Sequence, residues 1–360
     1  MTESTQTSDE PLKQQMTGRD DSPSIEHLTL REWQAFVASH PRSTVFHHHR
    51  WLELLSAQYA MKLKLVALRR EGEILAAIPF LECRSFLGSR KLISLPFSDV
   101  QPFLQQSPKD GEQLLSALDA HLPQNYRSIV IRCDEPLPTP YSTSHFVRHE
   151  INLDRPFAEI EKTFDSNIRR NLRRAQEGGL RFDSGVNRSL MEDFYRLHLA
   201  TRKKHGVPIQ PKSYFLRLQK EILEPGLGIV GRVSHNDRAV AAAVFLTYNQ
   251  TFLYKYGASD INALALRPND LLLYHGLRVG CERGYRQFDF GVSDRAQDGL
   301  RRFKTKWGAV ESDAFHCYVR GEPEEARTNS LALRTLSPAL RVAPAWCCRA
   351  LGELFYRYSP

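Results

Sequence analysis

The apolar residues in the second half of the chain follow a helical period in some segments and a strand period in others. In residues 188–204, for example, Leu190, Phe194 and Leu197 recur at helical spacing, which predicts one amphipathic helix. Pro268 is placed to open a later helix. Read in order, the pattern predicts a strand at 180–183, helices at 188–204 and 212–223, strands at 227–233, 239–248 and 251–256, a helix at 268–283, a strand at 287–290, a short helix at 298–305 and a strand at 314–320.

The first half of the chain repeats this order of elements. The pattern there predicts a strand at 27–30, helices at 31–39 and 48–59, strands at 63–69, 74–82 and 91–95, a helix at 111–122 and a strand at 127–132. Two segments also align by sequence, because EGEILAAIPFL at 71–81 and NDRAVAAAVFL at 236–246 share Ala-Ala and Phe-Leu at one constant offset. Chance similarity between two apolar strands is the alternative. With the matching element order, a duplicated domain is the better interpretation.

The length and composition of the chain agree with this duplication. A chain of 360 residues favours about two domains, and 41% apolar with 25% charged residues is ordinary for a soluble globular protein. We expect a mixed α/β fold in which each half forms a twisted mixed sheet flanked by helices. The expected parts are a disordered leader at 1–24, an N-terminal domain at 25–150, a C-terminal domain at 151–325 and a basic amphipathic tail at 326–360.

The charge of the chain favours anionic partners. A net charge of +8 suits phosphates, nucleic acid or acidic lipid head groups. No apolar run reaches the roughly 18 residues of a spanning helix, and the polar N-terminus lacks a signal core, so we expect a cytoplasmic protein. The six cysteines form no CxxC pair, which favours free thiols. The adjacent His47, His48 and His49 cannot all face one ion on a regular element, so no metal site is predicted.

Three segments of the second half resemble one known family. FDSNIRRNLRRAQEGGLRF (164–182) is similar to a helix of the form RRNxRRAxxxG, LRPNDLLLYHGLRVGCERGYRQFDFG (266–291) to a Pro-Asn helix start and a strand ending in Asp-Phe-Gly, and GLRRFKTKWGA (299–309) to a closing FKxxWG. These features resemble the FemAB-type aminoacyltransferases and related acyltransferases, which contain two tandem GNAT-like (acyl-CoA N-acyltransferase) domains. VFHHHRWLELL (45–55) and the tail resemble a narrower branch, the FemAB-like proteins of exopolysaccharide and exosortase systems.

The resemblance implies an acyltransferase without a tightly bound cofactor, with acyl-CoA or an aminoacyl-tRNA as co-substrate. In ordinary GNAT enzymes a glycine-rich loop after the fourth strand binds the pyrophosphate of acyl-CoA, but SDINALALRPNDLL (259–272) carries no glycine run. The helix that begins at Pro268 still offers free N–H groups, so Asn269 is a candidate phosphate-binding residue. The missing loop weakens acetyl-CoA as the donor. It fits the FemAB branch, a relative with an altered CoA site, or a degenerate and inactive domain.

Arginines flank the buried stripe of the helix predicted over 165–177. Four guanidinium groups on one and a half turns repel each other unless an anion lies among them, and arginine suits bidentate contact with phosphate. Arg170, Arg173 and Arg174 are therefore candidate ligands of an anionic, phosphate-bearing substrate. A solvated basic face, partnered by neighbouring acidic residues, is the alternative.

Two candidate catalytic residues lie near the strand predicted at 287–290. Asp289 alternates with Phe288 and Phe290, so it faces away from them. There it could accept a proton from an amine nucleophile, or it could cap the N–H groups of its own loop. From the resemblance to FKxxWG, we expect Lys304 to stabilise the oxyanion or the donor phosphate from an exposed loop. A merely solvated lysine is the alternative.

Two further segments carry aromatic residues that could meet a substrate or a surface. Tyr254 and Tyr256 are expected on one face of their strand, where Tyr256 could line an acceptor groove or simply pack against the sheet. The tail at 331–360 mixes aromatic, leucine and arginine residues around prolines. Its short amphipathic pieces could lie on an anionic membrane surface, or they could cover the edge of the second domain.

We therefore interpret the chain as a cytoplasmic acyltransferase that moves an acyl or aminoacyl group onto an amine of a cell-envelope or exopolysaccharide precursor. Peripheral binding to the inner membrane is an open alternative for its location. Such a reaction needs only positioning, proton removal and oxyanion stabilisation. One alternative is a peptidoglycan aminoacyltransferase that depends on aminoacyl-tRNA, although the coiled-coil arm of several tRNA-using relatives is not visible in the sequence. The other is a non-catalytic binding protein for phosphate-linked glycans.

Overall fold

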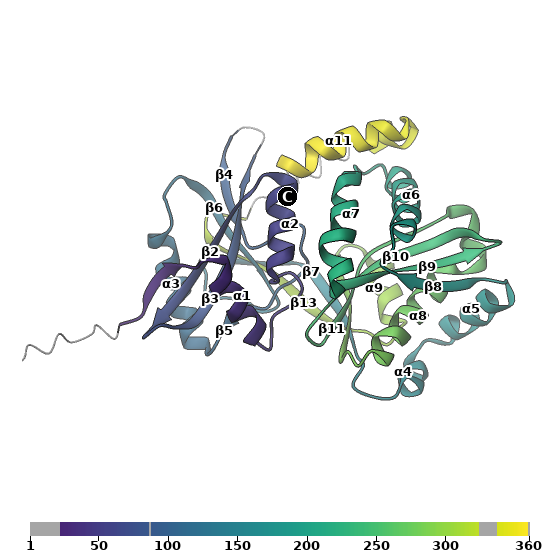
Figure 1. Cartoon of the computed structure of the whole chain (residues 1–360), viewed down its shortest axis with the longest axis horizontal. Helices are drawn as coiled ribbons and strands as arrows, with labels where there is room; N and C mark the ends of the chain where they lie inside the picture. The colour runs from purple at the N-terminus through teal and green to yellow at the C-terminus, as the bar shows by residue number, and fades with distance from the viewer. Residues whose placement is uncertain (1–21, 86–87, 324–336, 359–360) are drawn as a thin grey trace, which may run out of the picture.

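The computed structural model describes residues 22–85, 88–323 and 337–358, so the predicted leader and part of the predicted tail lie outside the described residues. The first half (Figure 1) contains β1 Ser24–His27, α1 Leu30–Ser39, α2 His49–Tyr59, β2 Lys62–Arg70, β3 Glu73–Arg84, β4 Arg90–Ile93, β5 Leu104–Gln105, α3 Pro108–His121, β6 Tyr126–Cys133 and β7 Tyr141–Asn152. The second half contains α4 Phe157–Thr163, α5 Ser166–Glu177, β8 Arg181–Gly185, α6 Arg188–His205, α7 Lys212–Leu218, the π-helical η1 Gln219–Leu227, β9 Gly228–His235, β10 Arg238–Tyr248, β11 Thr251–Ser259, the 3₁₀ turn η2 Ile261–Leu266, α8 Pro268–Glu282, β12 Gln287–Asp294, α9 Asp298–Thr305, β13 Val310–Arg320 and, last, α11 Ala345–Tyr358.

The two halves share one order of elements, as the sequence pattern predicts. In each half, one pair of neighbouring strands is parallel, β4 with β6 and β11 with β12, and the other strand pairs are antiparallel. The two aligned segments lie at equivalent places, because each begins with a turn of positive φ and enters a central strand. Their shared Ala-Ala and Phe-Leu residues are fully or almost fully buried. The mixed α/β fold with helices on a large mixed sheet is therefore confirmed.

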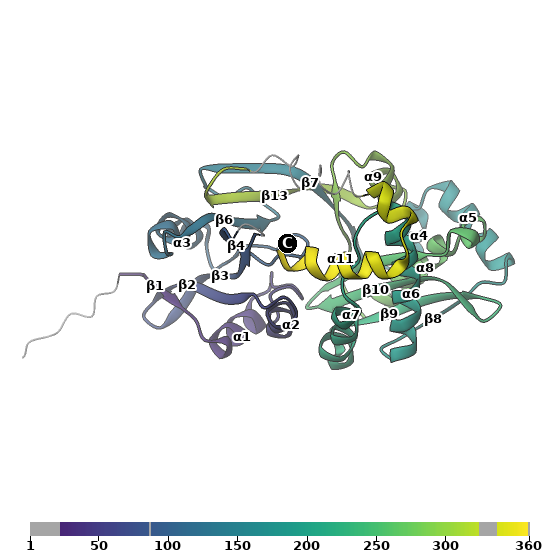
Figure 2. The same ribbon diagram turned by 90° about the horizontal axis from the view of Figure 1, so that it is seen from above.

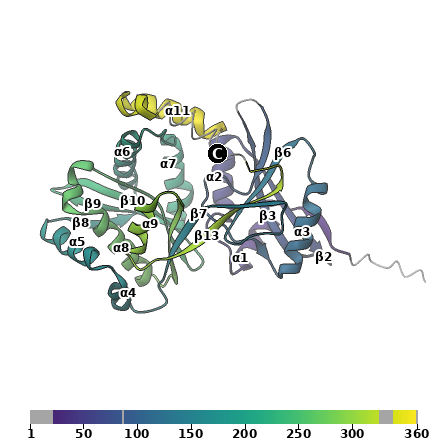
Figure 3. The same ribbon diagram turned by 180° about the vertical axis from the view of Figure 1, so that it is seen from behind.

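The strands of the two halves belong to one sheet, so the expectation of two separate sheets is wrong. The strand order is β1-β2-β3-β4-β6-β13-β7-β12-β11-β10-β9-β8. The long strands β7 and β13 pair with each other, while β13 also pairs with β6 and β7 also pairs with β12. Figures 2 and 3 show this pair running from one half to the other. The physical reason is that each long strand supplies backbone hydrogen bonds to both halves. The predicted boundary at 150/151 falls inside β7, a strand that the sequence pattern missed.

The two halves also share a hydrophobic core. One cluster of buried side chains includes Trp51 of α2 and Leu81 of β3 from the first half, and Tyr214 and Phe215 of α7 from the second. Two further clusters lie on the opposite faces of the sheet, one beneath α3 and one beneath α4, α5, α8 and α9. Among the described residues, no helix combines the length and the apolar content that crossing a bilayer requires.

The histidine run serves the local structure of the first half. His47 is almost completely buried and its Nδ1 accepts the Thr44 N–H at 3.0 Å. His48 caps α2, since its Nδ1 accepts the Arg50 N–H at 3.2 Å. All six cysteines are free thiols. Within the ranges that the structure describes, no group of three His, Cys, Asp or Glu side chains has the arrangement of a metal site.

Candidate active site

The candidate site lies where β11 and β12 separate. These parallel strands pair only from Thr251 with Gln287 to Leu253 with Asp289. Directly beyond this point each strand has a bulge toward its other neighbour. The register of β11 with β10 skips Lys255, and the register of β12 with β7 shifts between Asp289 and Val292. A β-bulge leaves its extra residue out of the hydrogen-bonded ladder. The backbone at this end of the two strands is thus available to other groups.

A residue of the first half lies in this opening. The Asp99 carboxylate is 3.1 Å from the Lys255 Nζ, which also donates to the Phe97 carbonyl oxygen at 2.9 Å. A Cβ atom added to Gly291 would lie 3.3 Å from the Asp99 Oδ2, and Gly291 has a φ of 67°. The positive φ therefore favours glycine here, and a Cβ atom would in addition press on the Asp99 carboxylate.

Lys304 reaches the same glycine from α9. Its side chain is buried rather than exposed in a loop, so that expectation is wrong. The Lys304 Nζ donates to the carbonyl oxygens of Gly291 at 2.8 Å and Val292 at 3.4 Å. Burial lowers the pKa of Lys304 to about 8, although the nearby carboxylates of Asp289 and Asp99 oppose this shift. The bulge in β12 explains the contact, because it exposes carbonyl groups that a regular ladder would use.

Asp289 holds the other side of the bulge. Its Oδ2 accepts hydrogen bonds from Arg148 at 2.8 Å from Nε and 2.7 Å from Nη2, and its Oδ1 accepts the Gly291 N–H at 2.7 Å. Both carboxylate oxygens are thus engaged, which matches the predicted alternative of an aspartate that caps its own loop. Arg148 also lies 2.6 Å from Glu150. Burial raises the pKa of Glu150, while the Arg148 charge opposes the rise.

A small cavity connects this ion pair with the first half. It has a volume of about 10 Å³, close to the space that one water molecule needs. Arg148 and Asp289 line one side, and Thr44, Phe46 and Val100 of the first half line another. The buried Arg148–Asp289 pair therefore borders a cavity that uncharged side chains of residues 44–100 close.

The two tyrosines of β11 lie on opposite faces of the sheet, so their expected common face is wrong. Tyr254 packs in the cluster beneath α8, whereas Tyr256 packs in the cluster that the two halves share. The extra residue Lys255 between them reverses the alternation of side chains. The Tyr256 hydroxyl is 3.0 Å from that of Tyr214, and burial raises its pKa. The Lys255 Nζ lies 5.5 Å from the Tyr256 ring centroid.

The predicted phosphate ligands lie on two helices, α5 and α8. Arg170, Arg173 and Arg174 are exposed on α5, and Arg170 donates to the Asn167 side chain at 2.7 Å. Asn269 donates to the Ser259 hydroxyl at 3.2 Å. The helices α5 and α8 pack together.

The residues that follow α9 contact the starts of α5 and α8. The Asp165 N–H, at the N-cap of α5, donates to the Lys306 carbonyl oxygen at 2.8 Å. Burial raises the pKa of Asp270, in the first turn of α8, to about 6, and the nearby Lys306 charge opposes this shift. The ends of α5, α8 and α9 therefore converge, although the arginines do not join the buried cluster around Gly291.

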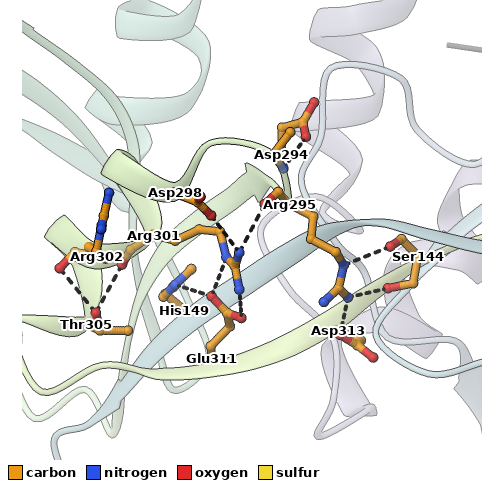
Figure 4. A network of polar contacts seen from close by, with 11 residues as sticks. Ser144, His149, Asp294, Arg295, Asp298, Arg301, Arg302, Thr305, Glu311 and Asp313 are labelled. Carbon is orange, nitrogen blue, oxygen red and sulfur yellow. Dashed lines mark hydrogen bonds and ion pairs between the residues drawn. The ribbon is translucent and has the colours of Figure 1, made fainter.

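A polar network fixes the outer side of α9 (Figure 4). Arg301 makes a bidentate pair with Glu311 of β13, at 2.9 and 2.7 Å, and it also contacts Asp298. The buried His149 of β7 lies 3.0 Å from the same Glu311, and burial lowers its pKa. An open groove of about 400 Å³ borders this network. The network links α9 to both long strands, and so it positions Lys304.

Several of these residues carry no strong sequence signal. Arg148, His149 and Glu150 lie on β7, whose alternating residues are polar on both faces and so resemble a loop. Asp99 lies in an irregular segment of the first half. Lys255 could have been found, because a lysine between two tyrosines in an apolar strand is unusual.

Comparison with known proteins identifies the class of this fold. Residues 162–305 match the family described as acetyltransferase (GNAT) domain. This range begins in α4 and ends just after Lys304. The solved structure of FemX is similar with a TM-score of 0.66 and 17% identity, covering 81% of this chain and 96% of that one. The predicted resemblance to the GNAT superfamily is thus confirmed for residues 162–305, and the likeness to FemX concerns the fold.

Two other solved structures share the fold. L-PGS from Bacillus licheniformis is similar with a TM-score of 0.54 and 15% identity, covering 87% of this chain and 98% of that one. The C-terminal domain of a putative lysylphosphatidylglycerol synthetase from Agrobacterium fabrum has a TM-score of 0.52 and 13% identity, covering 87% and 97%. At these identities the likeness concerns the fold alone. The sequence has no significant match among curated proteins. The GNAT domain supports acyltransferase activity in general.

Proposed function

We propose that the protein transfers an acyl or aminoacyl group onto an amine of a cell-envelope or exopolysaccharide precursor. The observation that carries this proposal is the buried Lys304 ammonium at the bulge of β12, beside the separated ends of β11 and β12. A charged donor held in a nearly dry site stabilises negative charge that develops there far better than it would in water.

The residues around Gly291 suit the steps of amine acylation. The amine nitrogen forms a bond to the acyl carbon, negative charge develops on the carbonyl oxygen, and the bond to the donor's oxygen or sulfur then breaks. Lys304, together with backbone N–H groups freed by the bulge at Lys255, would stabilise that oxygen. Glu150, whose pKa is raised by burial, would accept the proton that the attacking amine loses. Asp289 and Arg148 would keep the bulge in shape.

The donor would bind through its phosphates. Acyl-CoA is the usual co-substrate of GNAT enzymes, and an aminoacyl-tRNA offers the same phosphate chemistry. Arg170, Arg173 and Arg174 on α5 present exposed guanidinium groups next to α8, whose first turn offers free N–H groups around Asn269. Both features support an anionic donor at this end of the domain. The proposal thus separates donor binding, at α5 and α8, from chemistry at Gly291.

The test is to incubate the full-length protein with amino-sugar nucleotides as acceptors and with either an acyl-CoA or an aminoacyl-tRNA as donor. Mass spectrometry should detect an acceptor heavier by one acyl group with one of the two donors. Lys304→Met should abolish most of this product, whereas Lys306→Met, which changes an exposed lysine two residues away, should not. Absence of transfer from both donors, with phosphate-linked glycans still bound, would favour the non-catalytic binding protein instead.

A further inference from the structure

The C-terminal helix α11 has an inner face that is fixed to both halves of the molecule. The Arg202 Nη2 of α6 donates to the Tyr356 hydroxyl at 2.9 Å, and the Tyr356 ring centroid lies 5.5 Å from that of Phe97 in the first half. A Cβ added at Gly352 would meet the Ile209 carbonyl oxygen at 1.7 Å, so the helix lies directly on the backbone there. Figures 1 and 3 show α11 lying across one edge of the molecule, over α6.

The outer side of this segment exposes large apolar residues. Trp346 is 62% exposed and Val342, the last residue of the short helix at 337–342 that precedes α11, is 83% exposed. The other three tryptophans of the chain are fully buried: Trp33, Trp51 and Trp307. Exposing an indole ring to water forgoes the free energy that its burial would give. The outer side therefore has the composition of a contact surface, while the inner side covers the second half.

Exposed basic residues lie in the same segment as the exposed tryptophan and at the end of α6. Arg341 and Arg349 are exposed on either side of it, and Lys204 is exposed at the end of α6. Burial lowers the pKa of His205, and the charges of Lys204, Arg202 and Arg341 lower it further. These three basic side chains therefore all lie near His205. Lys203 adds a further charge beside Cys348 of α11. The surface thus combines positive charge with exposed apolar side chains.

We propose that this surface, defined by Lys203, Lys204, Arg341, Val342, Trp346 and Arg349, docks the protein onto an anionic lipid bilayer. Apolar side chains would enter the region of the head groups while the cations meet lipid phosphates. A nucleic acid would satisfy the charges, but it offers no apolar layer for Val342. The proposal concerns where the protein lies, so it stands or falls independently of the acyl-transfer reaction.

Trp346 is itself the reporter for the test. The full-length protein is mixed with vesicles of phosphatidylglycerol and phosphatidylcholine, or of phosphatidylcholine alone, and acrylamide quenching of tryptophan fluorescence is measured. Because the other tryptophans are buried, quenching reports on Trp346. Anionic vesicles should protect it and shift its emission to shorter wavelength, and added salt should weaken the effect. Trp346→Phe should remove the signal while vesicle co-sedimentation persists.

Matched variants separate the contributions to binding. Arg341→Gln with Arg349→Gln should weaken co-sedimentation with anionic vesicles about 30-fold, at about fivefold for each basic residue near an anionic surface. Val342→Ser with Trp346→Ser should weaken it about 10-fold or more through lost apolar burial. Arg181→Gln with Arg238→Gln, two exposed arginines on β8 and β10, is the control and should have little effect.

Three outcomes would overturn the proposal. Trp346 could remain equally open to acrylamide with anionic vesicles, or the control pair could weaken binding as much as the arginines around Trp346. Protection by a single-stranded RNA oligonucleotide, with none by vesicles, would assign the surface to nucleic acid. Circular dichroism of each variant at rising temperature would show whether the fold is intact, so that a loss of binding is not mistaken for unfolding.

Discussion

Replacing Lys304 with Met should separate catalysis from stability. The substitution keeps the length and apolar stem of the side chain and removes only the ammonium group. Burial lowers the pKa of Lys304 from 10.5 to about 8. Since each pKa unit corresponds to about 1.4 kcal/mol, keeping this group charged in the folded protein costs about 3 kcal/mol at neutral pH. A methionine would remove that cost.

The same substitution leaves two carbonyl groups without their donor. The oxygens of Gly291 and Val292 lie 2.8 and 3.4 Å from the Lys304 Nζ, and an unsatisfied buried acceptor costs about 1–3 kcal/mol. Two such acceptors cost about 2–6 kcal/mol, which opposes the gain of about 3 kcal/mol, so the free energy of unfolding should change by no more than about 3 kcal/mol. In contrast, loss of one oxyanion donor should lower kcat about 100- to 1000-fold.

The assay combines urea unfolding with acyl transfer followed by mass spectrometry, on Lys304→Met and on Lys306→Met. Lys306 is exposed, so its variant should leave both quantities nearly unchanged. Unchanged kcat with a large loss of stability would refute the reasoning and make Lys304 a structural residue. Equal loss of kcat at both lysines would point to a diffuse basic patch.

Four further predictions concern the titration of Lys304, the Asp289 carboxylate and the arginines of α5. kcat should fall as the pH rises through about 8, because Lys304 then loses its proton. Between about pH 8 and 10.5 the unfolded chain binds more protons at this group, so its contribution to the free energy of unfolding should rise with pH, and Lys304→Met should remove that rise. Asp289→Asn removes one of the two carboxylates that pair with the buried Arg148, leaving Glu150, and should lower the free energy of unfolding by about 1–3 kcal/mol in urea titrations, whereas Asp294→Asn on the exposed end of the same strand should not. The double variant Arg170→Gln with Arg173→Gln should weaken donor binding and reduce its dependence on salt in a binding titration. An unchanged salt dependence would mean that the arginines of α5 form a solvated basic face and do not bind the donor.

The sequence by itself determined the local elements and their order. Helical spacing in 188–204, the proline that opens α8 and the turn signals between strands are local properties, and the structure has these elements within a few residues of the predicted bounds. The Asp165 cap of α5 and its buried stripe of Ile168, Leu172 and Ala175 were predictable for the same reason. The repeat was visible because the segments 71–81 and 236–246 share the same apolar strand pattern, with Ala-Ala and Phe-Leu at the buried positions.

Only the tertiary structure decided how the candidate site is assembled. Asp99, Arg148 and Lys304 are far apart in sequence. Asp99 and Lys304 lie against Gly291 and Arg148 reaches it through Asp289, because two bulges and the shared strands β7 and β13 bring the halves together. A bulge is set by pairing with a neighbouring strand, so the alternation of residues cannot reveal it, and the expected common face of Tyr254 and Tyr256 was wrong for that reason. Burial is likewise a property of the whole fold. It turned Lys304 from an expected surface charge into a buried ammonium with a lowered pKa, because helix α9 packs over β7 and β12, two strands that the sequence does not show to be neighbours.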